Sequence, residues 1–145
     1  MTPEDIARIE AELGVRLPED YQALMRAYPF PPDSFTAEFA LLNEATRLIE
    51  INRERSEQSQ PAYKKGRTEP PASYFQIGGD GGEESYLIDL ARSHSPVYVY
   101  DLESAELRQA APSLESFVAQ CAATDEMIRR DEESTAGKRW WQLWR

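Results

Sequence analysis

The sequence predicts a single α+β domain: a mainly antiparallel sheet of about four to six strands, flanked by helices and followed by a C-terminal helical extension. Three observations support this class. Helical spacing bounded by proline and glycine opens the chain, short aromatic and β-branched runs separated by turn residues fill its middle, and helical spacing returns near its end. With 145 residues, 41% of them hydrophobic, the chain can bury one core.

Two short helices are expected at the amino terminus. Thr2 is a suitable N-cap, Pro3 suits the first helical position, and Gly14 suits the C-terminal end of the first helix. Pro18 opens the second helix, which three prolines after position 28 should end. The apolar residues between these signals recur at helical spacing: Ile6, Ile9 and Leu13 in the first helix, and Tyr21, Leu24, Met25 and Tyr28 in the second.

The next segments predict a strand, a helix and a loop. Apolar and polar residues alternate over residues 35–42, which is typical of a strand buried on one face. Residues 43–58 contain no Gly or Pro and are rich in Glu and Arg, so we expect a helix whose second half is exposed. Prolines, a glycine and basic residues over 59–71 indicate a surface loop.

An antiparallel meander should follow, because residues 74–77, 85–90 and 97–100 are short runs of strand-forming residues, with a fourth run over 106–110. Four glycines around Asp80 permit a tight turn between the first two strands.

A final helix is expected from the capping residue Ser113, with Leu114, Phe117, Val118 and Cys121 on one face. We therefore divide the chain into a domain over residues 1–122 and a charged, Trp-rich extension over residues 123–145. Trp140 and Trp144 share a helical face in this extension. They suit either an interface or packing against the body of the domain, and packing is favoured because exposed indoles form an apolar patch.

The charge balance favours basic protein partners. Acidic residues outnumber basic ones 26 to 16, giving a net charge of -10, which disfavours direct contact with nucleic acid or anionic membranes. Cys121 is the single cysteine, the first residues do not resemble a secretory signal, and no apolar run is long enough to span a membrane. We expect a cytoplasmic protein.

No catalytic, metal or cofactor site is predicted. Asp80, Glu83 and Glu84 could offer oxygens to a cation, but they lack the spacing of a calcium loop, and a structural hairpin turn is the favoured reading. His94 and Cys121 are the available base and nucleophile, yet Cys121 lies on an apolar helix face and nothing in the sequence pairs it with His94. We therefore expect no enzyme activity.

Several short motifs follow one another along the chain: Leu13-Gly14, Leu17-Pro18, Asp20-Tyr21, and Asp80-Gly81-Gly82 with Tyr86 and Asp89. In order and spacing they resemble the SUKH superfamily of Smi/Knr-like proteins over residues 4–122. The chain departs from that pattern at Glu83 and Glu84, where a further Gly and an Asp are usual, and at Tyr28-Pro29-Phe30, which replaces an Asn-Gly-Gly.

The resemblance implies a non-enzymatic immunity protein that neutralises a cognate bacterial toxin, for instance a nuclease with a basic groove. The alternative that it implies is a regulatory interaction scaffold of the Smi/Knr type, in which the C-terminal extension would have a larger role. The candidate contact residues are Asp80, Glu83 and Glu84, then Asp101 and Glu103, with Trp140 and Trp144 in the extension.

Overall fold

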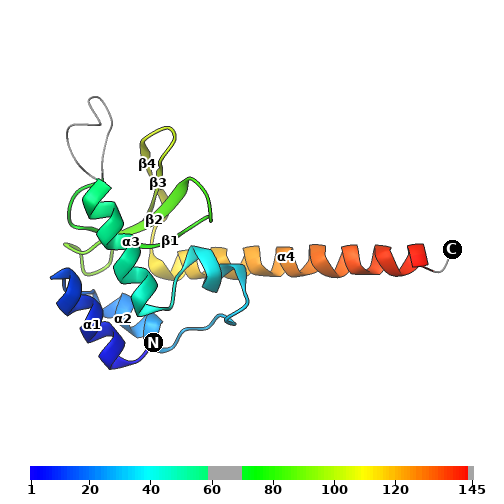
Figure 1. The fold of residues 1–145 in the computed structure, drawn as a ribbon, viewed down its shortest axis with the longest axis horizontal. Helices are drawn as coiled ribbons and strands as arrows, with labels where there is room; N and C mark the ends of the chain where they lie inside the picture. The colour runs from blue at the N-terminus through cyan, green and yellow to red at the C-terminus, as the bar shows by residue number, and fades with distance from the viewer. Residues whose placement is uncertain (59–69, 144–145) are drawn as a thin grey trace.

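A four-stranded antiparallel sheet with the strand order β1-β2-β3-β4 lies at the centre of the fold, as predicted, with helices beside it (Figure 1). The computed structural model describes residues 1–58 and 70–143; most of the predicted loop and Trp144 lie outside them. In chain order the elements are α1 (Pro3–Leu13), α2 (Glu19–Arg26), the π-helix η1 (Thr36–Ala40), α3 (Ala45–Gln58), β1 (Tyr74–Gly79), β2 (Glu84–Asp89), β3 (Val97–Asp101), β4 (Glu106–Ala111) and α4 (Leu114–Leu143).

Helix α1 begins and ends at the predicted residues, through hydrogen bonds and a backbone conformation of its own end residues. The Thr2 hydroxyl accepts the backbone N–H of Asp5 at 3.2 Å, and the Asp5 carboxylate accepts that of Thr2 at 3.0 Å, which completes a capping box. Gly14 ends the helix with a φ of 64°, a left-handed conformation in which glycine carries no steric penalty. The Glu10 side chain then accepts the backbone N–H of Leu17 at 3.0 Å and so links α1 to the start of α2.

The strand predicted for residues 35–42 is wrong, because this segment forms η1. The Ser34 hydroxyl accepts a backbone N–H of η1 at 3.1 Å, and the carboxylate of Asp125 in α4 accepts the N–H of its first residue at 3.1 Å. Side chains that satisfy backbone groups in this way compete with strand pairing. As a result Phe39, which the alternation placed inside, is 37% exposed.

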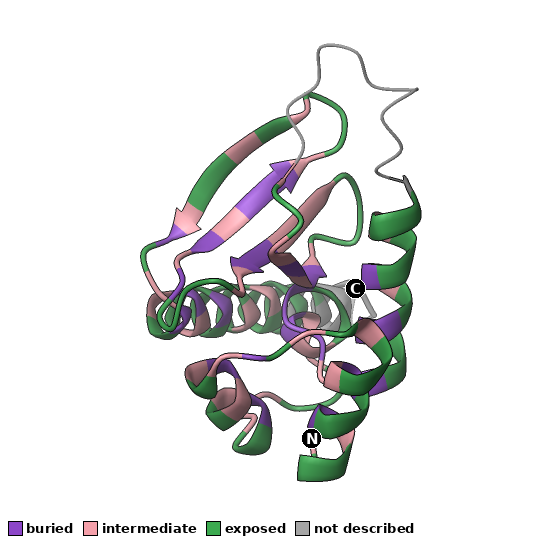
Figure 2. Cartoon of the chain, turned by 90° about the vertical axis from the view of Figure 1, so that its left-hand side faces the viewer, coloured by how far each residue is buried: buried purple, intermediate pink, exposed green. Residues whose placement is uncertain are grey.

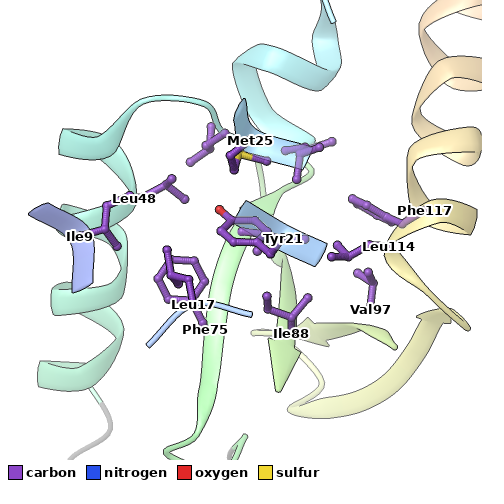
Figure 3. Close-up of a cluster of buried hydrophobic side chains, with 14 of the residues drawn as sticks. Ile9, Leu17, Tyr21, Met25, Leu48, Phe75, Ile88, Val97, Leu114 and Phe117 are labelled. Atoms are coloured by element: carbon purple, nitrogen blue, oxygen red, sulfur yellow. The ribbon is translucent and has the colours of Figure 1, made fainter. Parts of the chain in front are cut away.

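The core lies between the inner face of the sheet and the four α-helices (Figures 2 and 3). Tyr21 of α2 meets Phe75 of β1 edge to face at 5.8 Å, and Tyr86 of β2 meets Phe117 of α4 at 5.1 Å. The largest fully buried side chains include Ile9, Leu17, Tyr21, Met25, Leu48, Phe75, Ile88 and Val97.

The two edges of the sheet differ. The outer edge of β1 is covered by α3, where the Asn52 amide donates to the Gln76 carbonyl at 3.0 Å and accepts the Gln76 N–H at 2.8 Å, and Arg55 donates to the Tyr74 carbonyl. The backbone N–H of Leu42 also reaches the Ile77 carbonyl at 2.9 Å. At the other edge, no element of the described chain lies beyond β4 (Figure 2).

Helix α4 contacts the body only through its first turns and then runs away from it (Figure 1). Leu114, Phe117 and Cys121 are buried, whereas residues 129–135 are all exposed. The predicted folding of the extension back onto the body is wrong for the described backbone, because the helix continues to Leu143. Glu126 supports it through an ion pair with Arg130 at 2.7 Å. The side chain of Trp140 is outside what the structure describes.

Candidate interaction site at the acidic end of the sheet

The meander brings all five acidic candidates of the central domain to one end of the sheet. In an antiparallel meander alternate turns share an end, so the β1–β2 turn with Asp80 and Glu83 lies beside the β3–β4 turn with Glu103. The N–H of Leu102 donates to the Glu83 carbonyl at 2.9 Å and ties the two turns together. The pairing of β3 with β4 places a sixth carboxylate, that of Glu106, beside Asp101. The acidic end, as we name it, consists of Asp80, Glu83, Glu84, Asp101, Glu103 and Glu106.

Asp80 holds the first turn in shape while its side chain stays accessible. Its Oδ1 accepts the backbone N–H of Gly82 at 2.8 Å and that of Glu84 at 3.1 Å. Gly81, which directly follows Asp80, has a φ of 83°, a value that few residues other than glycine adopt. The predicted structural role of this turn is confirmed, and Asp80 is nevertheless exposed.

Asp101 has the same role in the second turn. Its Oδ1 accepts the backbone N–H of Glu103 at 2.8 Å and that of Ser104 at 3.2 Å. In both turns, therefore, one carboxylate is fixed by backbone donors. Glu83 and Glu103 are exposed beside them.

Glu84, Asp101 and Glu106 face one another across three strands, because Asp101 pairs with Glu84 in β2 and with Glu106 in β4. Like charges at such positions repel one another. Arg108 offsets part of this repulsion by an ion pair with Glu84 at 2.9 Å. The remaining carboxylates leave this end negative.

A groove of about 850 Å³ begins at the acidic end and runs between α3 and the outer face of the sheet. The stacked rings of Tyr74 and Tyr98, 4.9 Å apart, lie on that outer face. Phe39 and Leu102 line the groove near the two turns and are 37% and 43% exposed. Sequence reasoning missed both. Leu102 could have been found as an apolar residue within a polar turn, whereas the position of Phe39 depends on η1.

Cys121 and His94 do not meet. The His94 side chain is 85% exposed, and its Nδ1 lies 3.7 Å from the Asp20 carboxylate. Cys121 is buried in the core, and burial raises the pKa of its thiol to about 11. This arrangement agrees with the interpretation of Cys121 as a core residue.

We predict that Cys121 reacts with a disulfide reagent at pH 8 at least about 100-fold more slowly in the folded protein than in urea, because both burial and the raised pKa suppress the thiolate. Absorbance of the released thiolate measures the rate. Equal rates in the two states would contradict the buried position.

Two further findings concern the described residues. No group of three or more His, Cys, Asp or Glu side chains among them is arranged to hold a metal ion. None of the helices within them combines the length and apolar content that crossing a bilayer requires.

Comparison with known proteins gives one match. The model of the SMI1 / KNR4 family (SUKH-1) matches residues 1–120, which includes all strands and the start of α4. Comparisons with curated proteins and with solved structures found no match.

Proposed function

The chain belongs to the SMI1 / KNR4 family (SUKH-1), and on that basis we propose that it is a non-enzymatic immunity protein that binds and neutralises a basic cognate toxin. The acidic end of the sheet is the contact surface. The observation that carries this proposal is the gathering of six carboxylates at two adjoining turns, with Arg108 committed to Glu84.

The geometry suits a partner whose own ligand is anionic. A nuclease that attracts nucleic acid presents a basic groove, and fixed carboxylates can occupy it in place of phosphates. Backbone donors already hold Asp80 and Asp101, so binding orders few additional groups and loses little free energy to that ordering. We infer that the protein acts in the cytoplasm, by covering the toxin's substrate groove.

A second candidate function is a regulatory scaffold, and the projecting part of α4 favours it. Residues 129–135 are exposed on this helix, well away from the acidic end (Figure 1). A scaffold would use α4 and the acidic end for different partners. The immunity proposal uses the acidic end alone.

Co-expression with the protein encoded by the neighbouring gene tests the immunity proposal. We expect that protein to stop growth when expressed alone, growth to recover when both are expressed, and a stable complex to be purified. If growth does not recover and no complex forms, although this chain is folded and abundant, the immunity proposal fails.

Removing four charges at the acidic end is expected to slow association with that protein about tenfold at low salt and to flatten the dependence of the rate on salt. The variant combines Asp80→Asn, Glu83→Gln, Asp101→Asn and Glu103→Gln. It keeps the side-chain oxygens that hold both turns. Stopped-flow fluorescence measures the association rate.

The matched control removes four charges from exposed positions on α4: Glu126→Gln, Asp131→Asn, Glu132→Gln and Glu133→Gln. It changes net charge equally but leaves the acidic end intact. Equal slowing in both variants would mean that net charge, and not this surface, governs association.

A further inference from the structure

We propose that the groove at the acidic end accepts a segment of the partner that has a large apolar side chain next to Lys or Arg, with Phe39 and Leu102 as its apolar contacts. This inference rests on the proposed function and specifies which part of the partner is recognised. The occupant is a protein segment, because the carboxylates here repel phosphate groups.

Exposed apolar side chains concentrate at this end. Among the described residues three large hydrophobic side chains are exposed, namely Phe39, Leu102 and Met127. Phe39 and Leu102 line the same groove, together with Gly81 and Glu84. An apolar pair rimmed by charged groups is the usual arrangement of an interaction surface, whose energy comes mainly from a few apolar anchors.

The ring of Phe39 and the backbone of Leu102 are held in place before binding. The Phe39 ring lies against Gly81 so closely that a Cβ at that glycine would be 3.0 Å from the ring, and Phe35 supports it with ring centroids 5.2 Å apart. Leu102 is held through its backbone N–H, which donates to the Glu83 carbonyl. Contacts that are already ordered lose less entropy on binding.

The distribution of charge along the groove favours one orientation of the bound segment. The far end of the groove, beside the second half of α3, carries Arg53 and Arg55 with one carboxylate, Glu54. At the near end Glu84 lines the groove, and the other carboxylates of the acidic end adjoin it. Arg47, at the start of α3, donates to the Glu38 carbonyl at 3.0 Å, so its positive charge lies beside η1 and does not add to that of the far end. A bound segment therefore places its basic residues at the turns and neutral or acidic residues toward α3.

Nuclear magnetic resonance titration with short capped peptides tests this. The probe is Lys-Arg-Leu-Ser-Ser, and its controls are Lys-Arg-Ala-Ser-Ser and Glu-Asp-Leu-Ser-Ser. We expect saturable shifts of the amides of Phe39, Gly81, Gly82 and Leu102 with the first peptide. The alanine peptide should bind about tenfold more weakly, which corresponds to the loss of one buried leucine side chain. The acidic peptide should cause no shift.

The variants Phe39→Ser and Leu102→Ser should each weaken the first peptide about tenfold, whereas Met127→Ser, at an exposed apolar position on α4, should leave binding unchanged. Dispersed amide spectra confirm that each variant is folded. Equal binding of the leucine and alanine peptides, or no saturable shift with either, overturns the inference.

This outcome is separable from failure of the proposed function. One result is that the four-charge variant slows association with the neighbouring gene's product while Phe39→Ser and Leu102→Ser leave that complex unaffected. This result would exclude Phe39 and Leu102 as contacts and would support the acidic end as the contact surface. If co-expression neither restores growth nor gives a complex while the peptide still binds as expected, the groove stands and the immunity role is excluded.

Discussion

Gly78→Ala is expected to lower the free energy of unfolding by about 3 kcal/mol. A Cβ at this position would lie 2.2 Å from the carbonyl oxygen of Ala40 and 2.5 Å from that of Phe39. Both neighbours are backbone atoms of η1, so no side-chain rotation relieves the overlap. Either β1 or η1 must move, which separates η1 from the sheet and displaces Phe39 from the groove.

Urea denaturation followed by circular dichroism measures this loss, and at an m-value of about 2 kcal/mol/M the midpoint should fall by about 1.5 M. Gly82→Ala is the matched control, because its nearest neighbour would be the Asp80 side chain at 3.5 Å, an ordinary contact. We expect it to stay within about 1 kcal/mol of the parent protein. Equal stability of Gly78→Ala and Gly82→Ala would show that η1 does not pack on β1 as described.

Asn52→Ala is expected to cost about 3 kcal/mol of stability, because it removes hydrogen bonds to both the N–H and the carbonyl of Gln76 and one to the Leu48 carbonyl. Asn52 is only 7% exposed. Water therefore cannot readily replace the lost partners, and the groups left behind carry the desolvation penalty.

Two measurements check this prediction. Thermal and urea unfolding give the stability, and hydrogen exchange should show faster exchange at the amide of Gln76. Arg53→Ala changes the next residue of the same helix, which is exposed, and should stay within about 0.5 kcal/mol of the parent. If Asn52→Ala is as stable as Arg53→Ala, the amide does not hold α3 to the sheet edge.

Much of the fold could be predicted from the sequence because its signals are local. Thr2, Gly14 and Ser113 mark helix ends through groups within a few residues of themselves, and the β1–β2 turn depends on Asp80 and its glycines. The four strands and the α+β class followed from such signals and are confirmed.

The errors arose where distant residues decide the structure. The carboxylate of Asp125 binds the start of η1 from 89 positions away, and no periodicity in residues 35–42 reveals that contact. The extension was expected to return to the body because indoles avoid water, yet an unbroken helix to Leu143 leads away from it.

The candidate site was predictable in composition and only partly in extent. Five of its carboxylates were named from turn motifs, and the meander explains why they share one end. Glu106 was not chosen, because its neighbours Asp101 and Glu84 become known only from strand register. Phe39 required the position of η1 against Gly78 and Gly81.

The unequal edges of the sheet limit how copies of this protein can associate. A fibril that grows by strand addition needs two sheet edges with unpaired backbone N–H and C=O groups on every molecule. One edge pairs with the preceding copy and the other with the next. The backbone groups at the outer edge of β1 are already hydrogen-bonded to Asn52, Arg55 and Leu42. Another strand can therefore be added only at β4. Two molecules joined through β4 would leave no acceptor, and growth would end there.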